Sequence, residues 1–206
     1  MANIAKSNYK IVGDFVCFYL KNKDLFYLIH KVEQSPYALE LFNRVQNQRR
    51  IEGLQGVTIH FVSKDEAGSD RAFASANCEM DEGIISIRSD EINPEKLYSI
   101  IFELANLSQK KTKDRIDEEW TKGLITNGEQ LARKIERMEF KTNQITNEIF
   151  SRSIDNDYWE SSLEVYINNV NDFDTFWQEA LTTNHAQYYM QIFEKYDIIS
   201  KANTCA

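Results

Sequence analysis

The chain has 206 residues, with 24 lysines and arginines against 32 acidic residues and a formal net charge of −8. An acidic surface repels phosphate backbones and anionic lipid, so we expect neither nucleic acid nor a membrane as a partner. Hydrophobic residues make up 42% of the chain, well above the level of disordered segments, which predicts a folded domain. The three cysteines lack a Cys-x-x-Cys pair, which argues against a disulfide framework and a zinc knuckle.

The length predicts a single domain over residues 1–206. No stretch has the apolar core of a signal peptide or the ~20 apolar residues that span a bilayer. We therefore expect a cytoplasmic protein, or one exported by a specialised secretion system without a cleavable signal.

Residues 24–47 carry apolar side chains at three- and four-residue intervals, which predicts two short helices. Serine is a good N-cap and proline suits the first helical turn, so Ser35 and Pro36 predict that the second helix begins at Pro36. The preceding segment, residues 11–20, is aromatic and β-branched, and its class stays open.

From Gly56 the apolar period changes to two, with Val57, Ile59 and Phe61 on one face, which predicts strands. We expect a small antiparallel sheet of about three strands, near residues 57–63, 72–79 and 84–88.

Asn93 and Pro94 open a predicted helix over residues 94–109, followed by a charged connector from Lys110 to Lys122 with Trp120 as its buried anchor. A four-three apolar alternation predicts a long helix over residues 129–150, and two aromatic-rich helices are expected after it. The predicted fold is α+β and mainly helical, with the small sheet packed against the 94–109 helix and the long helix crossing that helix.

The apolar stripe of the 94–109 helix leaves three side chains pointing elsewhere, namely Phe102, Glu103 and Asn106. The ordinary interpretation is a partly exposed helix face with a packed phenylalanine. We nevertheless expect Glu103 to be at least partly buried and hydrogen-bonded by the long helix or a nearby cation, with Arg133 and Arg137 as candidates.

The order of strands, a helix reading Ile-Ile-Phe-Glu-Leu-Ala-Asn-Leu and a later helix reading Ile-Glu-Arg-Met-Glu-Phe resembles the zincin-type metallopeptidase layout. It is similar in particular to zincin-like domains associated with bacterial polymorphic toxins and secreted effectors. The resemblance covers residues 25–150 as a zincin-like core and leaves 151–206 as a C-terminal helical extension. A weaker similarity lies in the Thr-Thr-Asn-His string that ends at His185.

Zincins carry His-Glu-x-x-His on a helix, where two histidines hold zinc and the glutamate is the base for the zinc-bound water. The matching positions here are Phe102, Glu103 and Asn106, so only the glutamate is kept. Phenylalanine cannot bind zinc and asparagine is a poor ligand, so the resemblance implies no metal and no cofactor.

A third zincin ligand comes from a downstream residue, for which Glu136 and Glu139 are the positional candidates in this chain. Glu139 lies about 80° from the centre of the predicted buried stripe of the long helix, and Glu136 lies about 140° away. Glu139 is therefore better placed than Glu136 to point inward, and the favoured interpretation of both is an ordinary flanking charge on a solvated helix.

The first function that we expect is a catalytically inactive zincin-like domain that binds another protein, a toxin or a host target, as a bacterial effector or immunity-type partner. Phe102, Asn106 and Glu136 are its candidate binding residues. The first alternative is a metal-independent hydrolase or toxin in which Glu103 and Glu139 act as acid and base. The second alternative is a structural interaction module unrelated to zincins.

Overall fold

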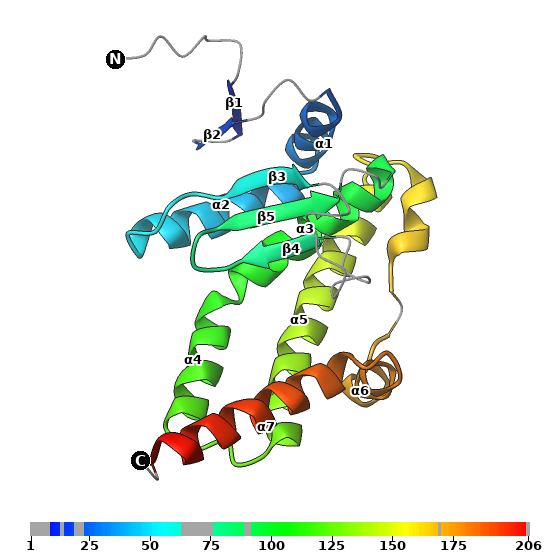
Figure 1. Ribbon diagram of the computed structural model, residues 1–206. Helices are drawn as coiled ribbons and strands as arrows, with labels where there is room; N and C mark the ends of the chain where they lie inside the picture. Colours follow the sequence, from blue (N-terminus) through cyan, green and yellow to red (C-terminus); the bar gives the residue numbers. More distant parts are fainter. Residues whose placement is uncertain are drawn as a thin grey trace, which may run out of the picture. The chain divides into compact units, whose positions relative to one another are not determined.

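Helices form most of the chain, and a few short strands accompany them, in the computed structural model of Figure 1. The structure describes residues 9–12, 15–18, 23–62, 76–88, 92–168 and 170–204. The predicted α+β, mainly helical fold is confirmed. The chain divides into two units, the first comprising residues 1–108 and 145–168 and the second comprising residues 109–144 and 169–206. Each unit has its own apolar core, and the single domain expected over the whole chain stays a prediction.

The first unit contains the strands together with the helices that pack on them. Its elements, in chain order, are β1 (Tyr9–Val12), β2 (Phe15–Phe18), α1 (Lys23–Gln34), α2 (Pro36–Ile51), β3 (Thr58–Val62), β4 (Ala76–Glu79), β5 (Ile84–Arg88), α3 (Asn93–Ser108), the end of α5 (Gly128–Asp155), and the 3-10 helix η3 (Ser161–Tyr166). Strands β1 and β2 form an antiparallel hairpin, in the segment whose class the sequence left open.

The three-stranded sheet has the order β3-β5-β4 (Figure 1). β4 pairs antiparallel with β5, but β3 pairs parallel with β5 and places Ile59 opposite Ile85. The prediction of an entirely antiparallel sheet is therefore wrong. A period of two fixes which side chains share a face but carries no information on strand direction. β4 begins at Ala76, and residues 72–75 and 63 of the predicted strands lie outside the described residues.

The core of the first unit centres on α3, which contacts α1, α2, β4, β5 and η3. The predicted stripe on α3 is confirmed, because all of its members are buried: Leu97, Ile100, Ile101, Leu104 and Leu107. On another side of α3, the Tyr98 ring lies 5.6 Å from the ring of Phe150 on α5. The long helix therefore contacts α3 at Phe150, and the expected crossing of the two helices stays a prediction.

Helix α2 begins where the sequence predicts. Ser35 is the N-cap, and its hydroxyl accepts a hydrogen bond from the amide of Ala38 at 3.3 Å, with Pro36 in the first turn. The same hydroxyl is 2.6 Å from that of Ser153 on α5, and both serines are fully buried. The N-cap residue of α2 therefore also connects the start of α2 to α5 through a hydrogen bond.

Arg49, near the end of α2, holds the turn between β4 and β5. Only 3% of this residue is exposed, and its guanidinium donates to the carbonyls of Gln55 at 2.6 Å, of Asp81 at 2.8 Å and of Met80. Gly83, in the same turn, has φ of +70°, and a Cβ there would lie 2.6 Å from the guanidinium. The turn therefore needs glycine both for its backbone angle and for the space that Arg49 occupies.

Replacing Arg49 with lysine is expected to lower the free energy of unfolding by about 2 kcal/mol, because one ammonium cannot reach all three carbonyls in place of the planar guanidinium. Arg50→Lys is the matched control, since Arg50 is the next residue of α2 and is exposed. Urea denaturation, monitored by circular dichroism, measures the free energy of unfolding of both variants. Equal midpoints for the two variants would contradict the role given to Arg49.

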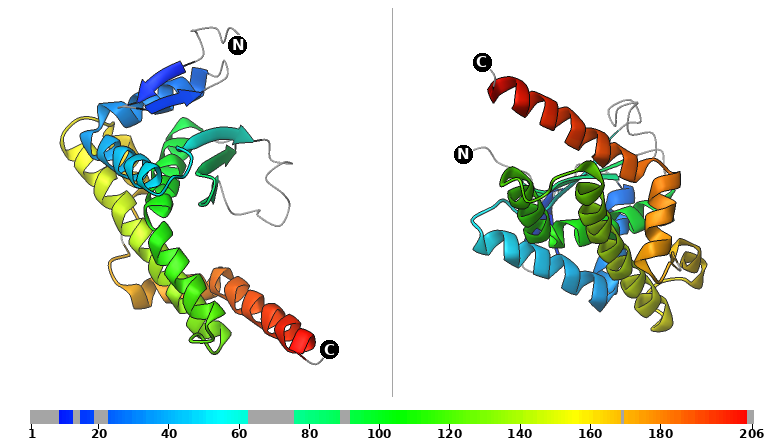
Figure 2. Two further views of the ribbon diagram at one scale, coloured as in Figure 1. Left: turned by 90° about the vertical axis from the view of Figure 1, so that its left-hand side faces the viewer. Right: turned by 90° about the horizontal axis from the view of Figure 1, so that it is seen from below.

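The second unit is helical. It contains α4 (Lys110–Thr121), the first part of α5, α6 (Phe173–Thr182) and α7 (His185–Thr204), and Figure 2 shows α7 as one continuous helix after α6. The two expected C-terminal helices and the long helix are confirmed, and α5 continues five residues beyond the predicted end at 150. Among the described residues, no helix is long and apolar enough to cross a membrane.

The predicted connector from Lys110 to Lys122 is wrong, because this segment forms helix α4. Its buried residue is Ile116, whereas the predicted anchor Trp120 is partly buried and stacks on Phe193 of α7. Ion pairs four residues apart support the helix in addition to the packing of Ile116: Lys110 with Asp114, Lys113 with Asp117, and Glu118 with Lys122.

Candidate functional site

The first candidate site is the segment of α3 that resembles the zincin motif. Glu103 and Asn106 are each only 7% exposed, and Phe102 is partly buried. The ordinary interpretation of these residues as a partly exposed helix face is therefore wrong, and the expected burial of Glu103 is confirmed. Helix α3 is surrounded within the first unit, so it buries polar side chains as well as its apolar stripe.

The two positions that hold zinc in zincins have other contacts here. The Phe102 ring stacks on that of Tyr98, one turn earlier, with the ring centres 6.0 Å apart. The Nδ2 amide of Asn106 donates to Oε2 of Glu103 at 3.0 Å. Across the part of the chain that the structure describes, no group of three or more His, Cys, Asp or Glu side chains is arranged to hold a metal ion.

The environment of Glu103 favours its protonated form. Burial raises the pKa of its carboxyl to about 7, and the hydrogen bond from Asn106 lowers it only in part. A buried carboxylate loses hydration that one neutral amide does not replace. At neutral pH Glu103 therefore carries a proton in a substantial fraction of molecules.

The cations expected beside Glu103 have their contacts in the second unit. Arg133 pairs with Glu129 at 3.1 Å and lies 4.7 Å from the centre of the Trp177 ring. Arg137 lies 4.4 Å from the centre of the Phe173 ring. The hydrogen-bond donor to Glu103 is Asn106 of its own helix, so the prediction of an arginine partner is wrong.

The ranking of Glu139 above Glu136 as the inward residue is also wrong, and so is the interpretation of Glu136 as a solvated charge. Glu136 is fully buried, whereas Glu139 is only partly buried. In the second unit α5 has a second buried face, where Ala132 packs with Trp177, Ala180 and Ala186 of α6 and α7. Glu136 follows Ala132 by one turn and lies on that face. Alanine and polar residues give this face no apolar period, so the sequence reveals only the stripe through Leu131 and Ile135.

Glu136 is hydrogen-bonded to His185, the first residue of α7. Its Oε1 lies 2.8 Å from Nδ1 of the histidine, and its Oε2 is buried without a hydrogen-bond partner. The hydrogen bond with Glu136 raises the pKa of His185, and the charges of Glu136 and Glu139 add to this effect. The side chain of His185 is about half exposed, at 48%. The sequence singles out His185 but gives no signal for its partner, which lies 49 residues earlier in the chain.

A histidine oriented by a buried carboxylate is the arrangement that orients a general base in hydrolases. In those enzymes the other ring nitrogen contacts a nucleophile. Within the described ranges, the His185 ring makes its hydrogen bond with Glu136 and with no serine, threonine or cysteine. Among the described residues the pair therefore has no nucleophile beside it, and it connects the start of α7 to α5.

Glu103 and Glu139, the expected acid and base, belong to different units, the first and the second respectively. Each has its environment within its own unit: Glu103 with Asn106, and Glu139 near His185. Comparison of the chain with models of known families, with curated proteins and with solved structures found no match.

Proposed function

We propose that the chain is a protein-binding domain without a metal centre, similar to a zincin-like domain whose ligand positions have been lost. Its setting would be bacterial toxin delivery, as an effector or as an immunity-type partner. The observation that supports this proposal is the hydrogen bond from Asn106 to Glu103 inside a buried helix. A zincin glutamate must instead face a water on an open metal position.

Phe102 adds to this argument, because its ring packs against Tyr98 at the position where a zincin has a histidine. A scaffold whose metal-ligand positions hold Phe102 and Asn106 has no metal chemistry to carry out, which leaves its surface as the part that acts. We therefore propose that the partner is another protein, a toxin or a host target, and that no cofactor takes part.

One observation favours a second candidate, a metal-independent enzyme that uses Glu103. A carboxyl with its pKa raised to about 7 is suited to donate and accept protons at neutral pH. Against it stands the burial of Glu103, which keeps substrate from the carboxyl unless α3 is uncovered. A third candidate, an interaction module unrelated to zincins, shares the binding function and differs only in ancestry.

Metal analysis and partner binding together test the proposal. After dialysis against zinc and then against metal-free buffer, the purified chain should keep far less than one zinc ion per molecule, measured by plasma mass spectrometry. The tagged chain, cross-linked in its native host, should retain one protein in stoichiometric amount, and Glu103→Gln should retain it equally. Stoichiometric zinc, or a toxic activity of the wild type that Glu103→Gln abolishes while it stays folded, would overturn the proposal.

A further inference from the structure

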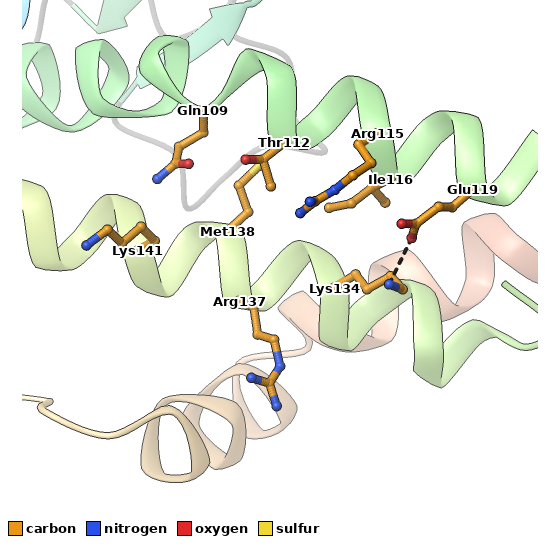
Figure 3. A pocket seen from close by; sticks show the side chains of 9 residues that line it. All are labelled: Gln109, Thr112, Arg115, Ile116, Glu119, Lys134, Arg137, Met138 and Lys141. Atoms are coloured by element: carbon orange, nitrogen blue, oxygen red, sulfur yellow. Dashed lines mark ion pairs between the residues drawn. The ribbon is translucent and has the colours of Figure 1, made fainter. Parts of the chain in front are cut away.

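A groove runs between α4 and α5 within the second unit (Figure 3), with a cavity volume of about 290 Å³. Its floor is apolar, formed by Ile116 and Met138, which are 3% and 4% exposed. Residues three, four and seven apart on each helix line it, as expected where one face of each helix borders a shared gap. The remaining lining residues are Gln109, Thr112, Arg115, Glu119, Lys134, Arg137 and Lys141.

The groove is cationic in a chain of net charge −8. Four of its lining residues are lysine or arginine, and only Glu119 is acidic. Glu119 is already paired, because Lys134 reaches it across the groove at 2.8 Å. That ion pair closes one end of the groove, as Figure 3 shows.

The remaining cations differ in where their charged ends lie. Arg137 contributes its stem to the groove but extends away from α4, and its guanidinium lies over the ring of Phe173. Arg115 reaches into the gap between the two helices (Figure 3). Arg115 is attracted to Glu119, but among the described residues neither Arg115 nor Lys141 has a hydrogen-bonded acid. Arg115 and Lys141 are therefore two exposed cations next to the apolar floor.

We propose that this groove is the docking site for an acidic, apolar peptide segment of the partner protein. The proposal rests on the protein-binding function and states which surface binds and what chemistry it recognises. An aspartate, glutamate or terminal carboxylate of the segment pairs with Arg115, whose planar fork suits two parallel hydrogen bonds to a carboxylate. A neighbouring leucine, isoleucine or phenylalanine packs on Ile116 and Met138.

The other side chains of the groove fit the same occupant. Gln109 and Thr112 offer an amide and a hydroxyl, which bond to the backbone of an extended peptide. Lys141 provides a second positive charge, farther along the groove from the Glu119–Lys134 pair. A nucleic acid would meet a chain of net charge −8 around this one cationic groove, and its phosphates gain nothing from the apolar floor.

Selection from a random dodecapeptide library displayed on phage tests the inference, with the full chain as bait. Selected peptides are then measured by fluorescence anisotropy against the wild type and against the groove variant Arg115→Glu/Lys141→Glu. The matched control is Arg44→Glu/Lys195→Glu, which makes the same charge change at exposed residues of α2 and α7. Circular dichroism and thermal melting establish that both double variants are folded.

We expect the selected peptides to be rich in aspartate and glutamate next to large apolar residues. The groove variant should weaken their binding by about tenfold or more, and the control should change it less than threefold. Basic or neutral peptides, or equal binding to the groove variant and the wild type, would overturn the inference. Full displacement of the peptide by millimolar phosphate would also overturn it, because the site would then be a simple anion site.

The two proposals fail in different ways. If no selected peptide prefers the wild type to the groove variant, the groove is not the docking site. The native-host experiment still decides the protein-binding function, because a partner retained equally by the groove variant binds elsewhere on the chain. A second copy of this chain as the occupant would instead appear as groove-dependent dimerisation in sedimentation, which likewise overturns the assignment to a partner protein.

Discussion

Glu103→Gln is expected to raise the free energy of unfolding at pH 8 by about 3 kcal/mol, with almost no effect at pH 4. Glutamine keeps the shape of the side chain and can still accept the hydrogen bond from Asn106, but it carries no charge that must be buried. The magnitude follows from the rise of the Glu103 pKa from 4.5 to about 7. Urea denaturation at the two pH values measures the difference.

The sign follows from proton binding. Below pH 4.5 the carboxyl is protonated in both the folded and the unfolded chain, so its burial carries no charge penalty. Between pH 4.5 and about 7 the unfolded chain ionises first, and the stability of the wild type falls as pH rises. Above that window the folded carboxylate is also ionised, and the loss is complete. The variant should lack this dependence.

Glu164→Gln serves as the control, because Glu164 is exposed in η3 of the same unit. It should change stability by less than about 0.5 kcal/mol at either pH. A loss of stability in Glu103→Gln at pH 8 would mean that a cation holds Glu103 ionised. That outcome would remove both the raised pKa and the basis for an acid–base role.

Local signals in the sequence predicted the helices of the first unit well, because the relevant physics acts within a few residues. Ser35 and Pro36 fix the start of α2, and the stripe of α3 has an unambiguous period. The direction in which strands pair, and a helix rich in ion pairs, were harder to predict. The apolar alternation in β3 does not indicate that β3 pairs parallel with β5. The apolar pattern also does not predict α4, because ion pairs between charged residues contribute to the stability of that helix.

In the candidate site, too, some features follow from neighbouring residues and others depend on elements that are distant in the sequence. Helix geometry places Glu103 about 95° from the centre of the apolar stripe, at the edge of the buried face, and it also allows the hydrogen bond with Asn106 three residues later. Its pKa depends instead on the elements that surround α3, which no local pattern encodes. The inward position of Glu136 depends on α6 and α7 covering a face marked only by Ala132.

His185→Ala is expected to lower the free energy of unfolding by about 2–3 kcal/mol near pH 6, because it leaves a fully buried carboxylate without its donor. His30→Ala is the control, since His30 is exposed on α1 and lies 3.9 Å from Glu33. It should change stability by less than about 0.5 kcal/mol. Calorimetric melting of both variants provides the measurement.

The loss caused by His185→Ala should depend on pH in a defined direction. The pKa of His185 is raised above its ordinary value of 6.5, so the charged pair contributes in full below pH 6.5 and weakens as pH rises through the folded-state pKa. A neutral imidazole can still donate from Nδ1, so part of the loss should persist at pH 9. Adding Glu136→Gln to His185→Ala should recover much of the stability, because the second change removes the unpaired buried charge. If the double variant is as unstable as the sum of both single variants, the pair does not act as a unit and α7 is held to α5 by its apolar contacts alone.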